Sequence, residues 1–190
     1  MNQNEDKTIQ IIGTHNKYLM KQANREINKI PKKRVFMNKY NLTEKEIPYE
    51  TQFALLKELN LDSKENIKCK EKRFMKQEIE RKIGSYKHQD ALKNLDQENF
   101  IDYNCIITQL LKCNMTCHYC FCQVFILYDN VREKHQWTVD RIDNAKGHTK
   151  DNYVISCLEC NIKRRAQFFD KFMFTKTLRL VKLSPIPITS

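Results

Sequence analysis

Two pairs of cysteines, each with two residues between its members, are the side chains of this 190-residue chain best suited to hold a metal ion. The first pair is Cys117 and Cys120 in CHYC, and the second is Cys157 and Cys160 in CLEC. This spacing lets a tight turn present both thiols to one ion, and four thiolates suit Zn²⁺ in a closed tetrahedral site. The pairs therefore predict a structural zinc site. It would stabilise a region that is too small to bury a sufficient hydrophobic core.

The other cysteines leave alternatives open for this site. Cys113 and Cys122 lie close enough in the sequence to compete as ligands, and His118 stands inside the first pair. Cys69 and Cys105 are expected to pack as small apolar residues or to remain inert. Because the chain has no apolar signal-peptide core, we expect a reducing, intracellular compartment, where eight cysteines serve as ligands or core residues and not as disulfides.

The second cysteine pair ends a stretch whose polar residues resemble a known nuclease family. After the first pair come VDRIDN at 139–144, GHTKDN at 147–152 and CLECN at 157–161. Together they resemble the HNH endonucleases, which have a ββα-metal fold with a treble-clef-like zinc knuckle, over about residues 113–169. The DRIDN variant is especially similar to HNH proteins of phages and large DNA viruses.

The resemblance implies a catalytic metal ion in addition to zinc. In the family a divalent cation is held between the end of the hairpin and the start of the helix, places taken here by Asp140 and Asn161. Both offer oxygen, as Mg²⁺ or Mn²⁺ prefers. Water would attack the scissile phosphate of DNA in line, and the products would carry 5′-phosphate and 3′-hydroxyl ends. The structural alternative for both residues is capping of a turn and of a helix start.

The general base is the point at which this chain departs from the family. The family base directly follows the metal-binding aspartate, where this chain has Arg141. Arginine stays protonated near neutral pH and cannot accept a proton, although it could clamp a phosphate. His148 and His135 are the candidate substitutes. His148 is preferred because it lies between Asp140 and Asn152, and its ordinary pKa suits a general base.

Two further polar residues belong to the same loop. Asn152 matches the family's central asparagine, which orients the base through the loop backbone. Asp143 is a further candidate ligand or base, and its structural alternative is capping of the loop.

The charge of the chain favours a nucleic-acid partner. Thirty-four Lys and Arg against 23 Asp and Glu give a formal net charge of +11, which favours phosphate neutralisation, although ribosomal and membrane-surface proteins share this bias. By the resemblance, the KRR segment lies on the first turns of the final helix against the minor groove. The expected nucleic-acid-binding residues are therefore Lys163, Arg164 and Arg165, together with Lys32, Lys33 and Arg34 of a basic arm.

Hydrophobic spacing predicts the elements that must position these residues. Between residues 51 and 83, apolar residues recur at helical spacing in two segments, 53–59 and 75–83, and Gly84 is expected to end the second. A third helix is expected at 103–111. Residues 123–128 and 136–140 are expected to pair as a hairpin. Ile162, Ala166, Phe169 and Met173 predict one amphipathic helix after the second cysteine pair.

These elements predict an α+β chain in which a helical extension precedes a small zinc-stapled ββα-metal module. We expect a basic polar arm at 1–50, the helical extension at 51–112, the module at 113–174 and an extended tail at 175–190. No apolar run reaches the roughly twenty residues of a membrane span, so we expect a protein of the cytoplasm or nucleus, including a viral or virion-associated one.

Three functions are consistent with the sequence. The leading one is a metal-dependent DNA endonuclease. The second is a zinc-stapled nucleic-acid-binding module that lost catalysis when arginine took the histidine position. The third is an architectural protein of a nucleoprotein assembly.

Overall fold

A computed structural model describes residues 17, 20–21, 32–34, 48–61 and 69–178 of the chain. The chain divides into two compact units, residues 1–33 and 34–190. Lys32 and Lys33 therefore belong to the first unit and Arg34 to the second. The helices from residue 49 onward, the sheet and the expected site residues from Arg34 onward belong to the second unit.

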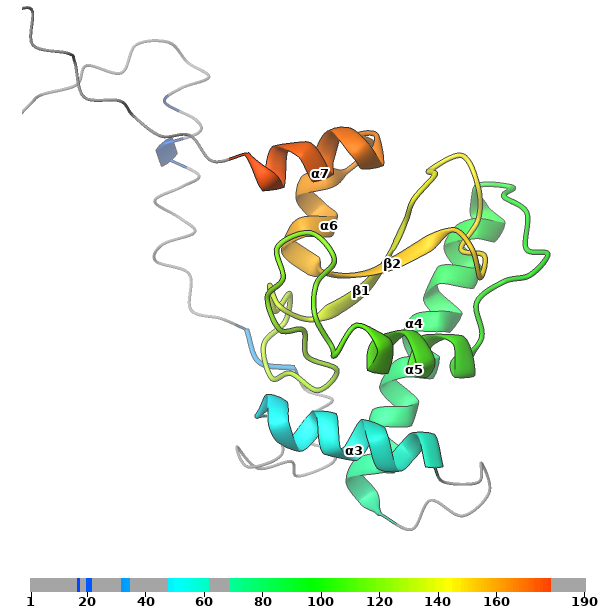
Figure 1. Cartoon of the computed structure of the whole chain (residues 1–190), viewed down its shortest axis with the longest axis vertical. Helices are drawn as coiled ribbons and strands as arrows, with labels where there is room; N and C mark the ends of the chain where they lie inside the picture. Colours follow the sequence, from blue (N-terminus) through cyan, green and yellow to red (C-terminus); the bar gives the residue numbers. More distant parts are fainter. Residues whose placement is uncertain (1–16, 18–19, 22–31, 35–47, 62–68, 179–190) are drawn as a thin grey trace, which may run out of the picture. The chain divides into compact units, whose positions relative to one another are not determined.

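In the described part of this unit, three helices precede the sheet (Figure 1). They are α3 (Tyr49–Leu61), α4 (Lys70–Leu92) and α5 (Tyr103–Lys112). The predicted helix near 103–111 is confirmed, and it begins at Asp102, whose carboxylate accepts a hydrogen bond from the Cys105 amide (2.9 Å). The protein is therefore a mixture of helices and a small two-stranded sheet, with α3, α4 and α5 N-terminal to the strands.

Helix α4 is longer than its apolar pattern predicts. It passes through Gly84, so the prediction that this glycine ends the helix is wrong. Tyr86 and Asp90, beyond the glycine, are both buried, and their contacts offset the roughly 1 kcal/mol that glycine costs inside a helix. The chain leaves the helix near Asn94, which has a φ of 52° in the left-handed region that asparagine tolerates.

One of the two predicted strands, 136–140, is observed as β1 (Trp137–Arg141), but its partner in the hairpin is a different segment. Strand β1 pairs antiparallel with β2 (Tyr153–Cys157), with Asp140 opposite Val154. The strand predicted at 123–128 is wrong, since that segment makes only isolated bridges. Its polar backbone is satisfied by Gln52 of α3, whose Oε1 accepts from the amides of Ile126 and Leu127 (2.9 and 2.8 Å). A side chain thus takes the place of a neighbouring strand.

The single helix predicted after the second cysteine pair is also wrong. The chain forms α6 (Leu158–Arg164) and α7 (Phe169–Thr177), separated by a turn in which Arg165 has a φ of 51°. The break returns α7 to the first cysteine pair, where the rings of Phe169 and Phe172 contact the ring of Tyr119. A continuous helix would carry these aromatic rings away from that contact.

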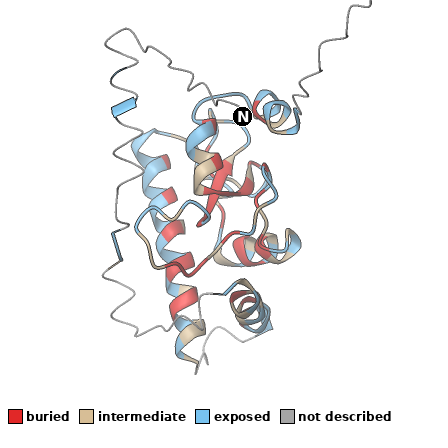
Figure 2. Cartoon of the chain, turned by 90° about the vertical axis from the view of Figure 1, so that its left-hand side faces the viewer, coloured by how far each residue is buried: buried red, intermediate tan, exposed pale blue. Residues whose placement is uncertain are grey.

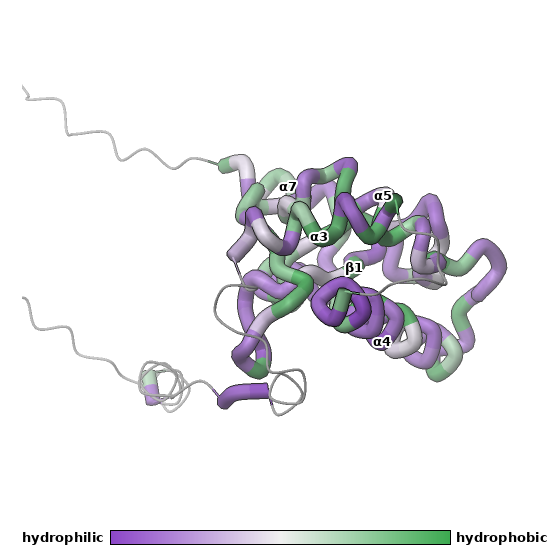
Figure 3. The backbone as a smooth tube through the Cα atoms, turned by 90° about the horizontal axis from the view of Figure 1, so that it is seen from below, coloured by the Kyte–Doolittle hydropathy of each residue, from purple (hydrophilic) through white to green (hydrophobic). Residues whose placement is uncertain are grey.

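The core lies around the hairpin, which is coloured as buried along most of its length in Figure 2. Trp137 is fully buried, together with apolar residues of α3, α4 and α5. Helix α4 is hydrophilic over much of its length in Figure 3, although it packs in this core. Its buried face includes four polar residues at intervals of four: Glu78, Lys82, Tyr86 and Asp90. Among the described residues, none of the helices is long and apolar enough to cross a membrane.

Candidate metal centre and catalytic pocket

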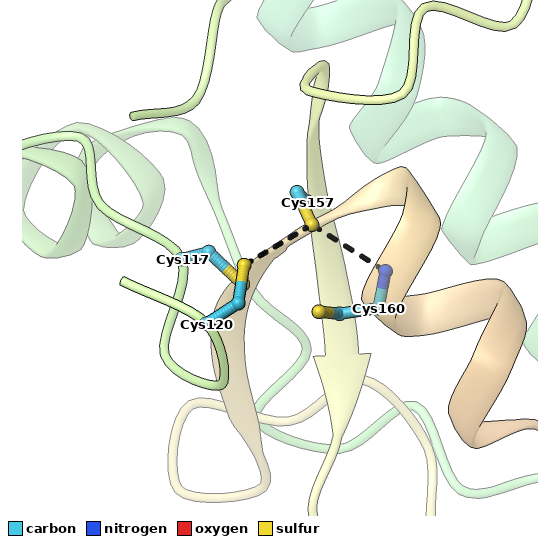
Figure 4. A group of neighbouring side chains, drawn as sticks. All are labelled: Cys117, Cys120, Cys157 and Cys160. Carbon is cyan, nitrogen blue, oxygen red and sulfur yellow. Dashed lines mark hydrogen bonds between the residues drawn. The ribbon is translucent and has the colours of Figure 1, made fainter. Parts of the chain in front are cut away.

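The four paired cysteines gather into one cluster (Figure 4). Their sulfur atoms all lie within 4.8 Å of one another, and Cys120 Sγ is 3.8 Å from Cys157 Sγ. Zn–S bonds of about 2.3 Å in a tetrahedron require S···S distances of about 3.8 Å, so the cluster fits a zinc ion. The four cysteines, three of them buried, could therefore hold a metal ion, as their spacing predicts.

Local backbone structure explains how each pair turns toward the other. The first pair lies in a tight turn, in which the Phe121 amide donates to the Cys117 carbonyl (3.0 Å) and Phe121 has a φ of 58°. The second pair begins α6, where the Cys160 amide donates to Cys157 Sγ (3.4 Å). The turn is joined to the sheet because the His118 amide donates to the carbonyl of Ile155 in β2 (2.9 Å).

The thiols of the cluster change one another's acidity. A hydrogen bond from Cys157 lowers the pKa of Cys117 to about 4, and the same contact raises the pKa of Cys157. One thiolate is thus favoured in the cluster while its neighbour keeps its proton. A bound cation would favour the thiolate form of all four, because metal binding releases ligand protons.

The alternative ligands take other positions. Cys122 is the nearest, with its sulfur 3.3 Å from Cys120 Sγ, but it is outside the group of four. The Cys113 thiol bonds to the Leu110 carbonyl (3.5 Å), and the ring of His118 lies against Phe169 with 5.4 Å between centroids. Cys69, expected to pack as an apolar residue, instead donates its thiol proton to the carboxylate of Glu71 (2.7 Å).

A separate pocket of about 600 Å³ lies between α4 and β1. It is lined by four residues that the sequence singled out for chemistry: Asp140, Arg141, His148 and Asn161. The pocket wall also includes polar and basic side chains of α4, so the helical extension and the hairpin enclose it together.

The carboxylate of Asp140 is buried and both of its oxygen atoms are engaged. Arg164 Nη1 donates to Oδ1 and the Tyr119 hydroxyl donates to Oδ2, each at 2.7 Å. Burial raises the pKa of Asp140 above its ordinary value, although both partners oppose this shift. Each oxygen keeps a second lone pair, because a carboxylate offers about four acceptor sites.

Asn161 lies in α6, with its amide directed at β1. Its Nδ2 donates to Thr138 Oγ1 (3.1 Å) and to the carbonyl of Val139 (3.2 Å), the residue before Asp140. The Oδ1 atom is on the other branch of the amide and remains as an oxygen donor beside the pocket. Asn161 is therefore joined to the strand that ends with Asp140 and Arg141.

His148 is held by a buried carboxylate that the sequence analysis missed. Its Nδ1 lies 2.8 Å from Asp90 Oδ1, and its backbone amide donates to Asp90 Oδ2 (2.6 Å). The imidazole also stacks on the ring of Tyr86, with 4.8 Å between centroids. Burial lowers the pKa of His148 below 6.5, and this effect exceeds the opposing attraction of Asp90. The imidazole is therefore neutral at neutral pH.

Asn152 stabilises the loop that contains His148 through hydrogen bonds to its backbone. Its Oδ1 accepts from the Asp143 amide (2.8 Å), and its Nδ2 donates to the carbonyls of Asp143 and Gly147 (3.0 Å each). Gly147 passes so close to the Asp96 carbonyl that no Cβ could be placed there. The amide of Asn152 thus orders the loop backbone next to His148.

The buried polar stripe of α4 explains how Asp90 reaches this loop. Side chains of α4 satisfy two backbone groups on the edge of β1 that β2 leaves unpaired: Lys82 Nζ donates to the Trp137 carbonyl, and the Val139 amide donates to the Tyr86 hydroxyl (3.0 Å). The next member of the stripe, Asp90, bonds to His148. The feature of the sequence that could have indicated this contact is the polar residue at every fourth position of α4, from Glu78 to Asp90.

The basic residues expected to bind nucleic acid differ in their environments. Arg164 is 1 % exposed, and it donates to Asp140 and to the carbonyls of Arg141 and Ile142. It is an interior residue, so the expectation that it contacts phosphate is corrected. Arg34 is also largely enclosed, since it pairs with buried Glu78 at 2.7 Å.

The two remaining residues of the KRR segment are exposed. Lys163 pairs with Glu159 at 2.9 Å, and Arg165 lines the pocket. Lys163 and Arg164 occupy the last turn of α6 and Arg165 follows it, so their expected place on the first turns of the helix is corrected.

The chain matches no family model, no curated protein and no solved structure. Its function must therefore be inferred from the geometry of the pocket and of the thiol cluster.

Proposed function

We propose that this protein is a metal-dependent endonuclease of the HNH type that hydrolyses phosphodiester bonds in DNA and contains a structural zinc ion. One observation carries the proposal. A single pocket collects a neutral imidazole oriented by a buried carboxylate, His148 with Asp90, and two oxygen-bearing side chains, Asp140 and Asn161. A metal-dependent phosphodiesterase can use a proton acceptor to activate water and a hard cation to stabilise charge on the phosphate.

The order of the elements supports the proposal. β1, its long loop, β2 and α6 follow one another as strand, loop, strand and helix, which is the order that the resemblance to ββα-metal nucleases implies. The zinc ion would tie the turn at Cys117 to the start of α6, which bears Asn161. Zinc would thus hold the helix that supplies one side of the pocket.

The chemistry assigned to the side chains is acid–base and electrostatic. His148 Nε2 would take a proton from water as its oxygen attacks phosphorus, and the bond from phosphorus to O3′ would break. Asp140 and Asn161 would hold Mg²⁺ or Mn²⁺, which supplies positive charge to the phosphate oxygens and the leaving oxygen. Products with 5′-phosphate and 3′-hydroxyl ends follow from this direction of cleavage.

Both side chains keep oxygen atoms that could bind such an ion, with one restriction. Asp140 keeps one acceptor site on each oxygen, and Asn161 keeps its amide oxygen. However, the Arg164 guanidinium lies 2.7 Å from Asp140 Oδ1, and its positive charge repels a second cation. We therefore expect weak metal binding in the free protein and tighter binding when a substrate phosphate adds negative charge.

Basic side chains around the pocket support a phosphodiester substrate. Within the part of the chain that the structure describes, Lys93, Arg132 and Arg165 are exposed and have no acidic partner. They come from α4, from the segment before β1 and from the end of α6. Such cations position a nucleic-acid backbone without reading its sequence.

A second candidate function is nucleic-acid binding without cleavage. It is favoured by the contacts of Asp140, whose two oxygens are already engaged by Arg164 and Tyr119, and by Arg141 at the family's base position. In that case the pocket would bind phosphate and the cysteine cluster would serve stability alone.

Cleavage of supercoiled plasmid with Mg²⁺ or Mn²⁺ separates the two candidates. We expect the native chain to nick the plasmid, and we expect His148→Ala to bind DNA normally but not to nick it. His88→Ala is the matched control, because His88 is exposed on α4 and does not line the pocket. Salt-sensitive binding with no metal-dependent nicking by the native chain would favour the second candidate.

A further inference from the structure

We infer that Asp90, in the helical extension, sets the protonation state of His148 and leaves Nε2 as the proton acceptor that serves the pocket. Asp90 is thus a positioning residue for the proposed nuclease, and α4 is part of its active site. The inference rests on the proposed function only for its catalytic consequence. The protonation state itself can be measured whether or not the protein cleaves DNA.

The geometry of the carboxylate requires this state. Asp90 is fully buried, and its two oxygens face two nitrogen atoms of the same residue: Oδ2 accepts from the His148 amide at 2.6 Å, and Oδ1 lies 2.8 Å from Nδ1. An ionised carboxylate can only accept hydrogen bonds, so Nδ1 must carry the proton. In the neutral ring the unprotonated nitrogen is then Nε2.

The surroundings of the ring keep it neutral and in place. Tyr86 of α4 stacks on the imidazole, and its hydroxyl is held by the Val139 amide. The charged groups that act on the ring are Asp90, Arg141 of β1 and Lys93 at the end of α4; the first favours the imidazolium and the other two oppose it. Arg141 Nη1 is also 4.0 Å from Asp90 Oδ1, so the guanidinium lies close to the same carboxylate.

The variant Asp90→Asn tests the inference, because a side-chain amide cannot accept hydrogen bonds from both the His148 backbone amide and Nδ1 as the carboxylate does. The backbone amide of His148 is a fixed donor and would take the side-chain oxygen of the new asparagine. Its NH₂ group would then face Nδ1, which must become the acceptor. The proton of the neutral ring would move to Nε2, and the pocket would lose its base.

The experiment is ¹⁵N NMR of the histidine rings in the full-length, zinc-loaded chain at about pH 8, above the ordinary pKa of histidine. A His148→Gln sample assigns the signals. We expect a protonated Nδ1 in the native chain and a protonated Nε2 in Asp90→Asn. An unchanged protonated nitrogen in Asp90→Asn would overturn the inference.

Glu78→Gln is the matched control for loss of a buried negative charge. Glu78 lies on the same helix, is fully buried and pairs with Arg34 and Arg81, but it does not contact His148. We expect this variant to lose stability while the His148 signals stay as in the native chain. A tautomer change in Glu78→Gln as well would show a general disturbance of α4 and would also overturn the inference.

The cleavage assay tests the catalytic consequence. We expect kcat of Asp90→Asn to fall by on the order of 10²-fold or more with little change in KM, as for a base held in the wrong tautomer. Full activity in Asp90→Asn with a switched tautomer would show that His148 is not the base. A switched tautomer with no cleavage by any form would support the role of Asp90 and contradict the nuclease.

Discussion

Nδ1 of His148 lies 2.8 Å from Oδ1 of Asp90, although the two residues are 58 positions apart and belong to a loop and to α4. The contact joins the helical extension to the loop between β1 and β2. Because both side chains are buried, a residue of α4 also determines the surroundings of the titratable His148 ring.

The pH dependence of cleavage should follow the protonation of His148. Burial lowers the pKa of this ring below 6.5, and only the neutral ring can accept a proton. We therefore expect activity to stay high as the pH falls to 6.5 and to decline below it, in the acid limb of kcat/KM. An acid limb centred above 6.5 would contradict the assignment of His148 as the base.

Protonation of the same ring should also affect stability. Since the folded pKa is lower than the unfolded one, the unfolded chain binds a proton first as the pH falls. The stabilisation is fully present above the unfolded pKa and is lost as the pH falls toward the folded pKa. Urea titrations of the native chain and His148→Gln should show a smaller decline below pH 6.5 in the variant.

Removal of one cluster thiol should release the zinc ion. Cys157→Ser is expected to lose stoichiometric zinc and the cooperative unfolding transition, because the free energy of binding a structural zinc is also folding free energy. Metal analysis and thermal unfolding measure both effects. Cys122→Ser is the control, since its sulfur lies 3.3 Å from Cys120 but outside the group of four. Loss of zinc in Cys122→Ser would instead make Cys122 a ligand.

The Tyr86 hydroxyl should contribute measurably to stability. Tyr86→Phe removes the acceptor of the Val139 amide at the edge of β1, and a buried unsatisfied donor costs about 1–3 kcal/mol. Tyr103→Phe is the control, because the buried Tyr103 hydroxyl has no hydrogen-bond partner among the residues that the structure describes, and its removal should cost nothing. Denaturant unfolding of both variants gives the comparison. Equal losses would contradict the role of the Val139 contact.

Arg164 should be required for folding and not for phosphate binding. Arg164→Met leaves the buried Asp140 without its ion pair, which costs about 3–5 kcal/mol. Adding Asp140→Asn should recover part of this loss, because the unpaired charge is then absent. Lys163→Met, at an exposed ion pair, should change stability by about 0.5 kcal/mol or less. Weaker DNA binding at unchanged stability in Arg164→Met would contradict this assignment.

The exposed cations at the pocket should determine the salt dependence of DNA binding. Lys93→Ala and Arg165→Ala should each reduce the slope of log K against log salt by about 1, the value for one lost phosphate contact. Lys87→Ala is the control, because Lys87 is exposed on α4 away from the pocket. Equal slopes for the native chain and all three variants would exclude the pocket as the phosphate-binding face.

The sequence alone determined the features that depend on neighbours along the chain. The spacing of Cys117, Cys120, Cys157 and Cys160 already predicted that a metal ion could be held, since a turn and a helix start bring each pair together locally. The periodic residues of α5 predicted its helix for the same reason. His148 was predicted as the general base from its place between Asp140 and Asn152. No neighbouring feature of the sequence indicated its partner, Asp90.

Tertiary structure alone decided the pairings between distant residues. The partner of β1 is 153–157 and not 123–128, because Gln52 satisfies the backbone of the latter segment. The interior role of Arg164 and the contact of Asp90 with His148 likewise arise only when α6 and α4 pack against the hairpin. Local spacing determines which face a side chain occupies, but burial and long-range packing determine which group it meets there.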